Sequence, residues 1–277
     1  MDSLVSTEWL AEHLEDPGLT IVDASWHMPA TGRSGHEEYC GAHIPGALFL
    51  DVDAVSDRSN PAPHMLPAPE AFGAAMAALG IGRDDRIVVY DNSPLRTAAR
   101  GWFMLRHFGA HDVAILDGGL QKWLAEGRPT EAGEAARERG DFNARPQPGI
   151  VSKEQILAGM TAPLLDARGK PRFEGSEADP RPGVAAGHIP GARNLPFASL
   201  YHADGTFKDR AAIRGLFQES GVDPADAFVA SCGSGVTACS LIFAAHLLGN
   251  DQPRLYDGSW SEWGTDPDTP KEIGPAA

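Results

Sequence analysis

The sequence predicts an α/β protein built from two tandem copies of one domain, each with a mainly parallel sheet covered by helices on both faces. The first observation is an internal repeat in which three segments recur in the same order: GAHIPGA (41–47) as AGHIPGA (186–192), IVDA (21–24) as LLDA (164–167), and DGGLQKW (117–123) as DGSWSEW (257–263). Two copies of one fold explain this order. The second observation is that short apolar runs alternate with helical patterns in both copies, which is typical of a parallel sheet.

The repeat sets the predicted domain boundaries. We expect a first domain at 1–126, a linker at 127–149 and a second domain at 150–277. The linker is rich in glycine, proline, alanine and charged residues, and it has no lasting apolar period. With 277 residues, 42% of them hydrophobic, the chain is long enough to bury two modest cores.

The first copy alternates helix and strand along its length. Gly80 follows one helical pattern as a stop signal, and the run RIVVY (86–90) is typical of a buried strand. The expected helices cover 7–14, 69–79 and 95–108, and the expected strands cover 20–24, 47–51, 86–90 and 112–116.

The second copy repeats this alternation. Ser152 and Gln155 have the spacing of a capping box, in which serine and glutamine side chains satisfy the first N–H groups of a helix. Further on we expect a helix at 209–220 that stops at Gly221, a strand at 227–231, and a helix that stops near Gly249. Ligands of such sheets bind at the carboxyl ends of the strands, so residue 232 is in the expected place for a site.

Composition excludes several classes of function. The net charge of −15 argues against nucleic-acid binding, which needs a basic face. No apolar run approaches the roughly 20 residues that span a bilayer, and no secretory signal is visible at the N-terminus. Three cysteines, without the His and Cys spacing typical of zinc, suit a reducing compartment. We therefore expect a cytoplasmic protein.

The stretch SCGSGVTAC (231–239) is the most informative in the chain. The apolar run AFVA (227–230) leads into Cys232, a loop of small residues follows, and an apolar helical pattern begins at Val236. Such a loop turns backbone N–H groups inward and places the positive end of a helix dipole beside the sulfur. Both effects favour the thiolate, which is the nucleophile. A buried structural cysteine is the plainer interpretation, but the two glycines and the strand-to-helix position favour a reactive site.

Only the second copy has this nucleophile. Aligning 88–92 with 229–233 places Asp91 opposite Cys232. We therefore expect the first copy to be non-catalytic by itself, either as a scaffold or as one wall of the active site. Polar residues at strand ends and in the repeated motifs are expected to have structural roles: Asp23, Asp166, Arg168, Asp117, Asp257, His43 and His188. Trp260 and Trp263 are expected in the core or at an interface, with the loop after Asp257 as a candidate border of the pocket.

The repeat, the two HIPG segments and the CGSGVT loop (232–237) resemble those of the two-domain rhodanese-like sulfurtransferases, over nearly the whole chain. The resemblance implies a tandem pair of rhodanese-like domains, the second of them catalytic. Within the family, the loop is similar to that of the 3-mercaptopyruvate sulfurtransferases. Thiosulfate sulfurtransferases carry arginine and lysine at the positions of Gly233 and Ser234, where two cations suit a dianion. Neutral residues suit the mono-anionic carboxylate of mercaptopyruvate.

Other site residues follow from this resemblance, position by position. Arg172 and Arg181 match the two arginines that hold the carboxylate and carbonyl of the substrate, and a guanidinium binds a carboxylate as a planar fork. From the residues alone, both fit a solvated surface loop equally well. Asp53 and His64 match residues proposed to form a charge chain with the loop serine, Ser234.

The resemblance also implies a mechanism. Substrate enters between the domains, the Cys232 thiolate attacks its sulfur, and the enolate of pyruvate leaves while a persulfide stays on Cys232. Loop N–H groups of Gly233, Gly235, Val236 and Thr237 cradle the sulfur, and Ser234 is a candidate proton donor. The persulfide then passes to cyanide or to a thiol such as thioredoxin. This chemistry needs no metal and no organic cofactor.

Three alternatives remain open from the sequence. The donor could be thiosulfate, although the uncharged loop argues against it. A cysteine phosphatase needs arginine at the sixth position after the cysteine, where this chain has Ala238. A non-enzymatic binding module is expected to have an altered nucleophile loop in both copies, whereas the loop at Cys232 is intact.

Overall fold

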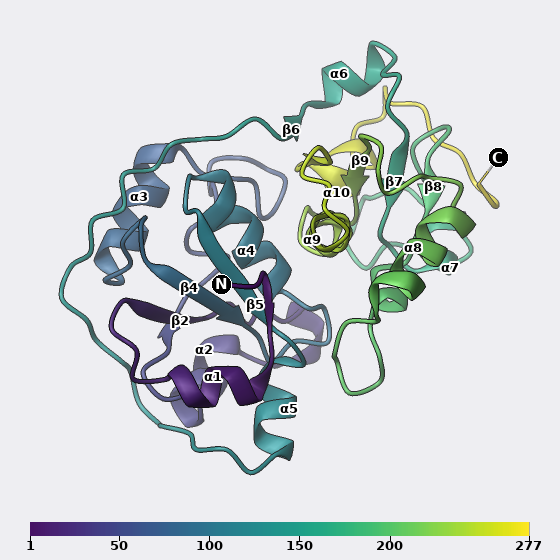
Figure 1. Cartoon of the computed structure of the whole chain (residues 1–277). Coiled ribbons are helices and arrows are strands. Elements are labelled where there is room, and N and C mark those ends of the chain that lie inside the picture. The colour runs from purple at the N-terminus through teal and green to yellow at the C-terminus, as the bar shows by residue number, and fades with distance from the viewer. Residues whose placement is uncertain (277) are drawn as a thin grey trace. The chain divides into compact units, whose positions relative to one another are not determined.

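The computed structural model describes residues 1–276, and the chain divides into two compact units (Figure 1). The first unit comprises Met1–Ser56, Leu66–Pro148 and His202–Phe207. The second unit comprises Asp57–Met65, Gly149–Tyr201 and the chain from Lys208 onward. The segment Asp57–Met65 therefore packs with the second unit, although it lies within the first repeat along the chain.

The first unit holds a five-stranded sheet in which every pairing is parallel. In spatial order its strands are β1 (Leu4–Val5), β5 (Asp112–Leu116), β4 (Arg86–Tyr90), β2 (Leu19–Asp23) and β3 (Leu48–Phe49). β4 and β5 have the predicted bounds. β3 is shorter than predicted, because Ala47 N–H closes a turn on the Ile44 carbonyl and the Asp51 side chain accepts from the Asp53 and Ala54 N–H groups of the next turn.

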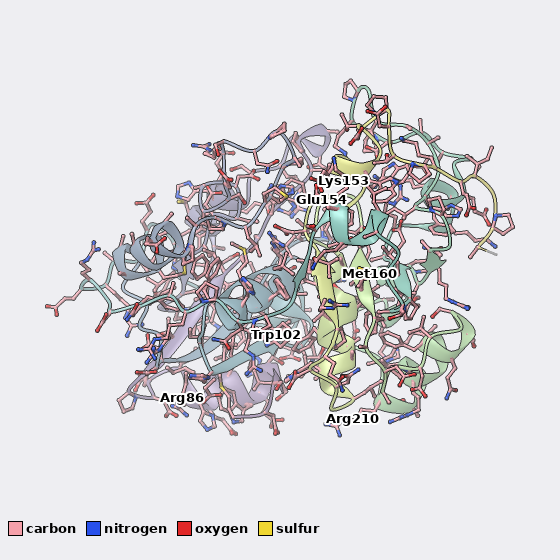
Figure 2. All side chains as sticks on the ribbon, turned by 90° about the horizontal axis from the view of Figure 1, so that it is seen from above. Arg86, Trp102, Lys153, Glu154, Met160 and Arg210 are labelled. Atoms are coloured by element: carbon pink, nitrogen blue, oxygen red, sulfur yellow. The ribbon has the colours of Figure 1, made fainter. Side chains whose placement is uncertain are left out.

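Helices cover both faces of this sheet (Figure 1). On one face lie α1 (Thr7–His13), α2 (Gly35–Gly41) and α5 (Gly119–Ala125), and on the other lie α3 (Pro69–Ala78) and α4 (Ala98–His107), while Pro29–Thr31 forms a short 3-10 turn. On the first face, Leu10, Tyr39 and Trp123 pack in one cluster with Val88 of the central strand. On the other, Trp102 is 3% exposed, and its Nε1 donates to the Val113 carbonyl at 3.1 Å (Figure 2).

The second unit repeats this sheet, again with every pairing parallel. In spatial order its strands are β6 (Ile150–Val151), β10 (Arg254–Tyr256), β9 (Val229–Ser231), β7 (Leu164–Asp166) and β8 (Arg193–Asn194). The central strand β9 is fully buried and ends one residue before Cys232. The fold is thus the predicted tandem pair of parallel α/β units.

The helices of the second unit are α6 (Lys153–Leu157), α7 (Lys170–Glu174), α8 (Arg210–Glu219), α9 (Ala238–Leu247) and α10 (Ser259–Trp263), with a 3-10 turn at Phe197–Leu200. The predicted capping box is confirmed at the start of α6. The predicted bounds of α8 are right to within one residue. The predicted start of α4 at residue 95 was wrong by three residues, because Arg96 has a φ of 54° and the chain turns there before the helix begins.

Several residues have the structural roles expected of them. His43 and His188 are each 1% exposed, and each Nδ1 lies within 2.9 Å of a carbonyl of its own unit. Arg168 pairs with Asp166 at 2.7 Å and stacks 4.6 Å from the centre of a ring of Trp260. Trp260 and Trp263 are each 1% exposed in the core. Within residues 1–276, no helix is long and apolar enough to cross a membrane.

Candidate active site

The candidate nucleophile lies where the central strand of the second sheet ends. Cys232 follows β9 directly, residues 233–237 form the loop, and α9 begins at Ala238. Cys232 is 1% exposed, so its sulfur lies within the fold and not on an open surface. Gly235 has a φ of 75°, a backbone conformation that other residues rarely adopt, so glycine is required at this point of the loop.

Ser259, at the start of α10, binds this loop through hydrogen bonds. Its Oγ accepts from the N–H groups of Cys232 and Gly235, each at 3.1 Å, and donates to the Tyr256 carbonyl at 2.8 Å. Ser259 itself has a φ of 49°, which costs a non-glycine residue about 1 kcal/mol or more. Sequence reasoning missed this residue. The available signal was that the repeat places glycine, Gly119, at the same position of the first copy.

Other loop N–H groups remain available to a ligand. Among residues 1–276, the backbone N–H groups of Gly233, Ser234, Val236 and Thr237 donate to no protein acceptor. Four such N–H groups in a partly buried loop at the start of a helix can bind an anion or a polarisable atom.

Two arginines border the loop, and one buried acid holds both. The side chain of Asp179 is 1% exposed, and it accepts from Arg172 Nη2 at 2.6 Å and from Arg181 Nε and Nη2 at 2.8 and 2.9 Å. Although burial raises the pKa of Asp179, the hydrogen bonds from Arg181 and Arg172 lower it to about 2. The carboxylate therefore stays charged at neutral pH. Asp179 was not singled out from the sequence, because nothing local shows that both arginines share it.

The arginines reach the cysteine loop itself. Arg181 Nη1 donates to the Gly233 carbonyl at 2.7 Å, and a Cβ placed on Gly233 would lie 3.3 Å from Arg181 Nη2 and 3.5 Å from Arg172 Nη2. The Arg172 Nε is buried and has no hydrogen-bond partner in the structure. An unpaired buried guanidinium N–H is costly unless an acceptor comes to it, so it points to an anionic ligand.

The loop serine has a histidine partner within the second unit. His64 Nδ1 lies 2.8 Å from Ser234 Oγ, and His64 is 6% exposed with a φ of 63°. The segment that carries it is closed by a bond from Asp57 N–H to the Met65 carbonyl at 2.8 Å. Asp53 belongs to the first unit, where its Oδ2 accepts from Trp26 Nε1 at 2.8 Å. The structure thus brings His64 and Ser234 together, while the link from Asp53 to His64 stays a prediction.

The other two cysteines differ from Cys232. Cys239 is buried in α9, as expected, and its Sγ donates to the Gly235 carbonyl at 3.2 Å. Cys40 is half-buried on α2 in the first unit. Neither directly follows a strand.

Comparison with known proteins agrees with this geometry. The rhodanese-like domain matches residues 6–126 and 152–266. The chain is 42% identical to the 3-mercaptopyruvate sulfurtransferase of Escherichia coli K12, with 97% of each chain covered. It is 40% identical to the thiosulfate/3-mercaptopyruvate sulfurtransferase 1, mitochondrial, of Arabidopsis thaliana, with 98% of this chain and 78% of that one covered. The crystal structure of the 3-mercaptopyruvate sulfotransferase SseA from Escherichia coli superposes with a TM-score of 0.86 at 40% identity, covering 95% of this chain and all of that one.

Proposed function

Because the chain belongs to the rhodanese-like family and carries two copies of its domain, we propose that it is a sulfurtransferase that takes sulfur from 3-mercaptopyruvate. The sulfur passes through a persulfide on Cys232 to a thiol or to cyanide, and pyruvate is released. One observation carries this proposal: the cysteine loop with four available N–H groups is bordered by two arginines that a single buried carboxylate holds in place. A sulfur nucleophile and a carboxylate clamp therefore lie within one site.

The first half-reaction is an attack on sulfur. The Cys232 thiolate forms a bond to the thiol sulfur of the donor, and the carbon–sulfur bond of the donor breaks. The bonding electrons leave with the carbon as the enolate of pyruvate, the donor's S–H proton stays on the persulfide, and one proton from the site converts the enolate to pyruvate. The available N–H groups from Gly233 to Thr237 stabilise the charge on sulfur during this step.

The arginines bind the donor and stabilise the leaving enolate. Mercaptopyruvate has one carboxylate and an adjacent carbonyl, and the guanidinium groups of Arg172 and Arg181 place positive charge beside the loop. The unpaired Nε of Arg172 is a donor for one of these oxygens. Asp179 accepts from both guanidinium groups, so the arginines are oriented before substrate arrives and little side-chain entropy is lost on binding.

Ser234 and His64 supply the proton in this proposal. The 2.8 Å contact between Ser234 Oγ and His64 Nδ1 gives the hydroxyl a partner that can return the proton it donates. Asp53 completes the proposed chain by orienting the histidine. The proton is needed only in the transition state, where negative charge develops on the enolate. Loss of the proton donor should therefore lower kcat more than it raises KM.

The second half-reaction transfers the outer persulfide sulfur to an acceptor nucleophile. The acceptor thiolate attacks that sulfur and the Cys232 thiolate leaves, which restores the enzyme. We propose a dithiol protein of the thioredoxin type as the acceptor and the cytoplasm as the compartment, because a thiol acceptor is maintained only where disulfides are kept reduced.

Steady-state kinetics with cyanide as acceptor tests the proposal. Release of pyruvate and thiocyanate in equal amounts from mercaptopyruvate is expected, with kcat/KM more than tenfold higher than for thiosulfate. Cys232→Ser is the matched control, because it exchanges only the sulfur for an oxygen and cannot form a persulfide. Release of pyruvate at the same rate by this variant would overturn the proposal.

Thiosulfate is the second candidate donor, since the Arabidopsis relative is named for both donors. The dianion would meet the two arginines but no cationic side chain at 233 or 234. A kcat/KM for thiosulfate equal to or above that for mercaptopyruvate would establish this candidate in place of the first.

A further inference from the structure

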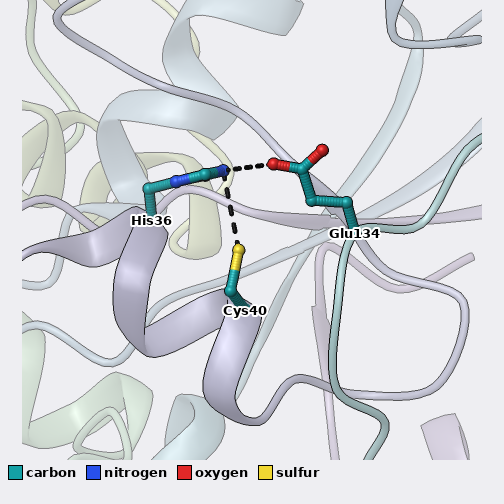
Figure 3. Close-up of side chains that lie close together, drawn as sticks. All are labelled: His36, Cys40 and Glu134. Carbon is teal, nitrogen blue, oxygen red and sulfur yellow. Dashed lines mark hydrogen bonds and ion pairs between the residues drawn. The ribbon is translucent and has the colours of Figure 1, made fainter.

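We infer that the first unit binds a zinc ion through His36, Cys40 and Glu134. These three side chains lie together in the first unit, whereas Cys232 and its loop belong to the second, and Figure 3 shows the three converging. His36 Nε2 lies 3.0 Å from Glu134 Oε1 and 3.7 Å from Cys40 Sγ. One potential ligand atom from each residue lies within 4.8 Å of the other two.

The donor set and its dimensions suit Zn²⁺. Imidazole, thiolate and carboxylate are its usual protein ligands, and three of them with one water make a tetrahedral site. Zinc–ligand bonds of about 2.0–2.3 Å at tetrahedral angles separate sulfur from nitrogen by about 3.6 Å and nitrogen from oxygen by about 3.4 Å. The observed separations of 3.7 and 3.0 Å need shifts of less than about half an ångström. The third separation, between Cys40 Sγ and the Glu134 oxygen, is at most 4.8 Å and must close toward about 3.6 Å, which the exposed Glu134 side chain can do by rotation.

Two ligands come from one helix face. His36 and Cys40 are four residues apart on α2, and side chains at this spacing lie one above the other. The His36 ring also contacts Phe49, with 5.2 Å between the ring centroids, which limits the directions the ring can take. The sequence search for Cys and His spacing missed this pair, because the third ligand is distant in sequence.

The third ligand is held by its backbone. On one side of Glu134, Gly133 N–H donates to the Cys40 carbonyl at 2.8 Å, and on the other, Ala135 N–H donates to Tyr39 Oη at 3.1 Å. Two further bonds of 2.9 Å join His43 and Glu131 in both directions. Glu134 therefore faces α2 at low cost in entropy, although its side chain is 71% exposed.

The site belongs to the first copy alone. The second copy has the matching bridge, between His188 and Glu272, but the repeat places Ala185 at the position of Cys40. The shared bridge thus needs no metal. Binding would join the segment around Glu134 to α2 and occupy the thiol of Cys40, the one cysteine of the described chain that is not fully buried.

Zinc binding at this site releases one proton. Zinc replaces the thiol proton of Cys40, which goes to solvent. Nε2 of His36 gives up the hydrogen that it donates to Glu134, and Nδ1 carries the hydrogen in the metal-bound tautomer. No electron transfer takes place.

Titration of the reduced, full-length protein with Zn²⁺ against a chromophoric chelator tests the inference. One zinc per chain is expected, and Glu134→Gln should weaken it by at least about tenfold, since even outer-shell changes do so. Glu37→Gln is the matched control, because Glu37 is exposed on the same helix and outside the cluster. Equal affinity for zinc in wild type and Glu134→Gln would overturn the inference.

A second readout identifies the cysteine. Zn²⁺ should slow alkylation of Cys40 by iodoacetamide at least about tenfold, measured by peptide mass, and the protection should be lost in Glu134→Gln. Co²⁺ in place of zinc should give a thiolate-to-metal absorption band that Cys40→Ser removes. Unchanged alkylation of Cys40 at saturating zinc would show that the ion binds elsewhere and would refute the site.

Discussion

The loop after β4 in the first unit and the loop after β9 in the second connect a central strand to the following helix in the same way. In the first unit, Asp91 has the place of Cys232. Its carboxylate is buried and accepts from the N–H groups of Ser93 at 2.8 Å and Ala98 at 2.7 Å. The carboxyl group of the first loop thus pairs with N–H groups of its own chain. The second loop has a thiol in that place, and four of its N–H groups donate to no protein acceptor among residues 1–276.

The segments that follow β5 and β10 bind the two loops through the same backbone hydrogen bond, but one of their side-chain differences, Gly119 against Ser259, changes the loop contacts. Leu120 N–H donates to the Asp91 carbonyl at 2.9 Å, and Trp260 N–H donates to the Cys232 carbonyl at 3.0 Å. Gly119 has a φ of 57° and approaches the Asp91 carbonyl so closely that a Cβ would lie 2.4 Å from its oxygen. Ser259 keeps the positive φ but adds a hydroxyl that binds the cysteine loop, so strain is retained where it orders the nucleophile.

Each loop has an arginine that donates to the same backbone carbonyl. Arg33 donates to the Asn92 carbonyl at 3.2 Å and pairs with Glu38, as Arg181 donates to the Gly233 carbonyl and pairs with Asp179. An arginine on this carbonyl is therefore part of the shared scaffold. The thiol, the second arginine and the common acid distinguish the second unit, and these are the features to test.

Replacement of the nucleophile should have the largest effect. Cys232→Ser should lower sulfur transfer by at least about 10⁴-fold, because a hydroxyl cannot carry the persulfide sulfur. In the wild type, mass measurement after treatment with mercaptopyruvate should locate the added sulfur on the peptide that contains Cys232. Added sulfur on Cys40 or Cys239 would show that the loop comparison has identified the wrong cysteine.

Removal of either arginine from the clamp should have the next largest effect. Arg172→Ala and Arg181→Ala should each lower kcat/KM for mercaptopyruvate about ten- to a hundredfold, since a charge-assisted bond contributes about 1.5–3 kcal/mol. Arg33→Ala is the matched control on the first loop and should leave kcat/KM unchanged. An equal loss in all three variants would mean that the arginines support the scaffold and do not bind substrate.

Ser259 separates loop ordering from backbone strain. Ser259→Gly copies the first unit: it relieves the positive φ but removes the hydroxyl that accepts from the Cys232 and Gly235 N–H groups. We expect kcat to fall roughly tenfold with KM little changed, because loss of a buried hydrogen-bond partner costs about 1–3 kcal/mol. Ser259→Ala should lose as much activity and unfold more readily than Ser259→Gly, by about 1 kcal/mol. Wild-type kcat in both variants would remove Ser259 from the positioning of the loop.

The pH dependence of stability should differ between the units. Burial raises the pKa of Asp23 to about 7, whereas its counterpart Asp166 pairs with Arg168. In the unfolded chain this carboxyl has an ordinary pKa of 3.8 and ionises first, so the contribution of Asp23 to stability is greatest below pH 4 and falls as the pH rises to about 7. The effect is at most about 1.4 kcal/mol per pKa unit.

Urea unfolding at pH 5 and pH 8 measures this effect. Relative to Asp23→Asn, the wild type should lose stability between the two values, since the buried amide does not titrate. Parallel changes in both proteins would contradict a raised pKa at Asp23. Asp179 should act in the opposite direction, because its pKa is held at about 2 and its contribution is lost only as the pH falls from about 4 toward 2.

The sequence by itself predicted the central strands and most of the longer helices, and it singled out Cys232 as the candidate nucleophile. β4 and β5 were predicted with their bounds, and the capping box of α6 was predicted from Ser152 and Gln155. Such features depend on neighbours within a few residues. The hydrophobic period, the helix caps and the helix stop signals can therefore be identified from the sequence. The SCGSGVTAC stretch is also local, which is why Cys232 and its loop could be singled out.

Only the tertiary structure decided which distant side chains meet. Arg172 and Arg181 share Asp179 because the chain turns back between α7 and the loop, and Ser259 reaches Cys232 across 27 positions of sequence. His64 meets Ser234 across 170 positions, because Asp57–Met65 packs with the second unit. Composition and periodicity do not predict such pairs, because the pairs arise from the packing of whole helices, strands and loops. The charges and hydrogen bonds of the site are therefore properties of the fold.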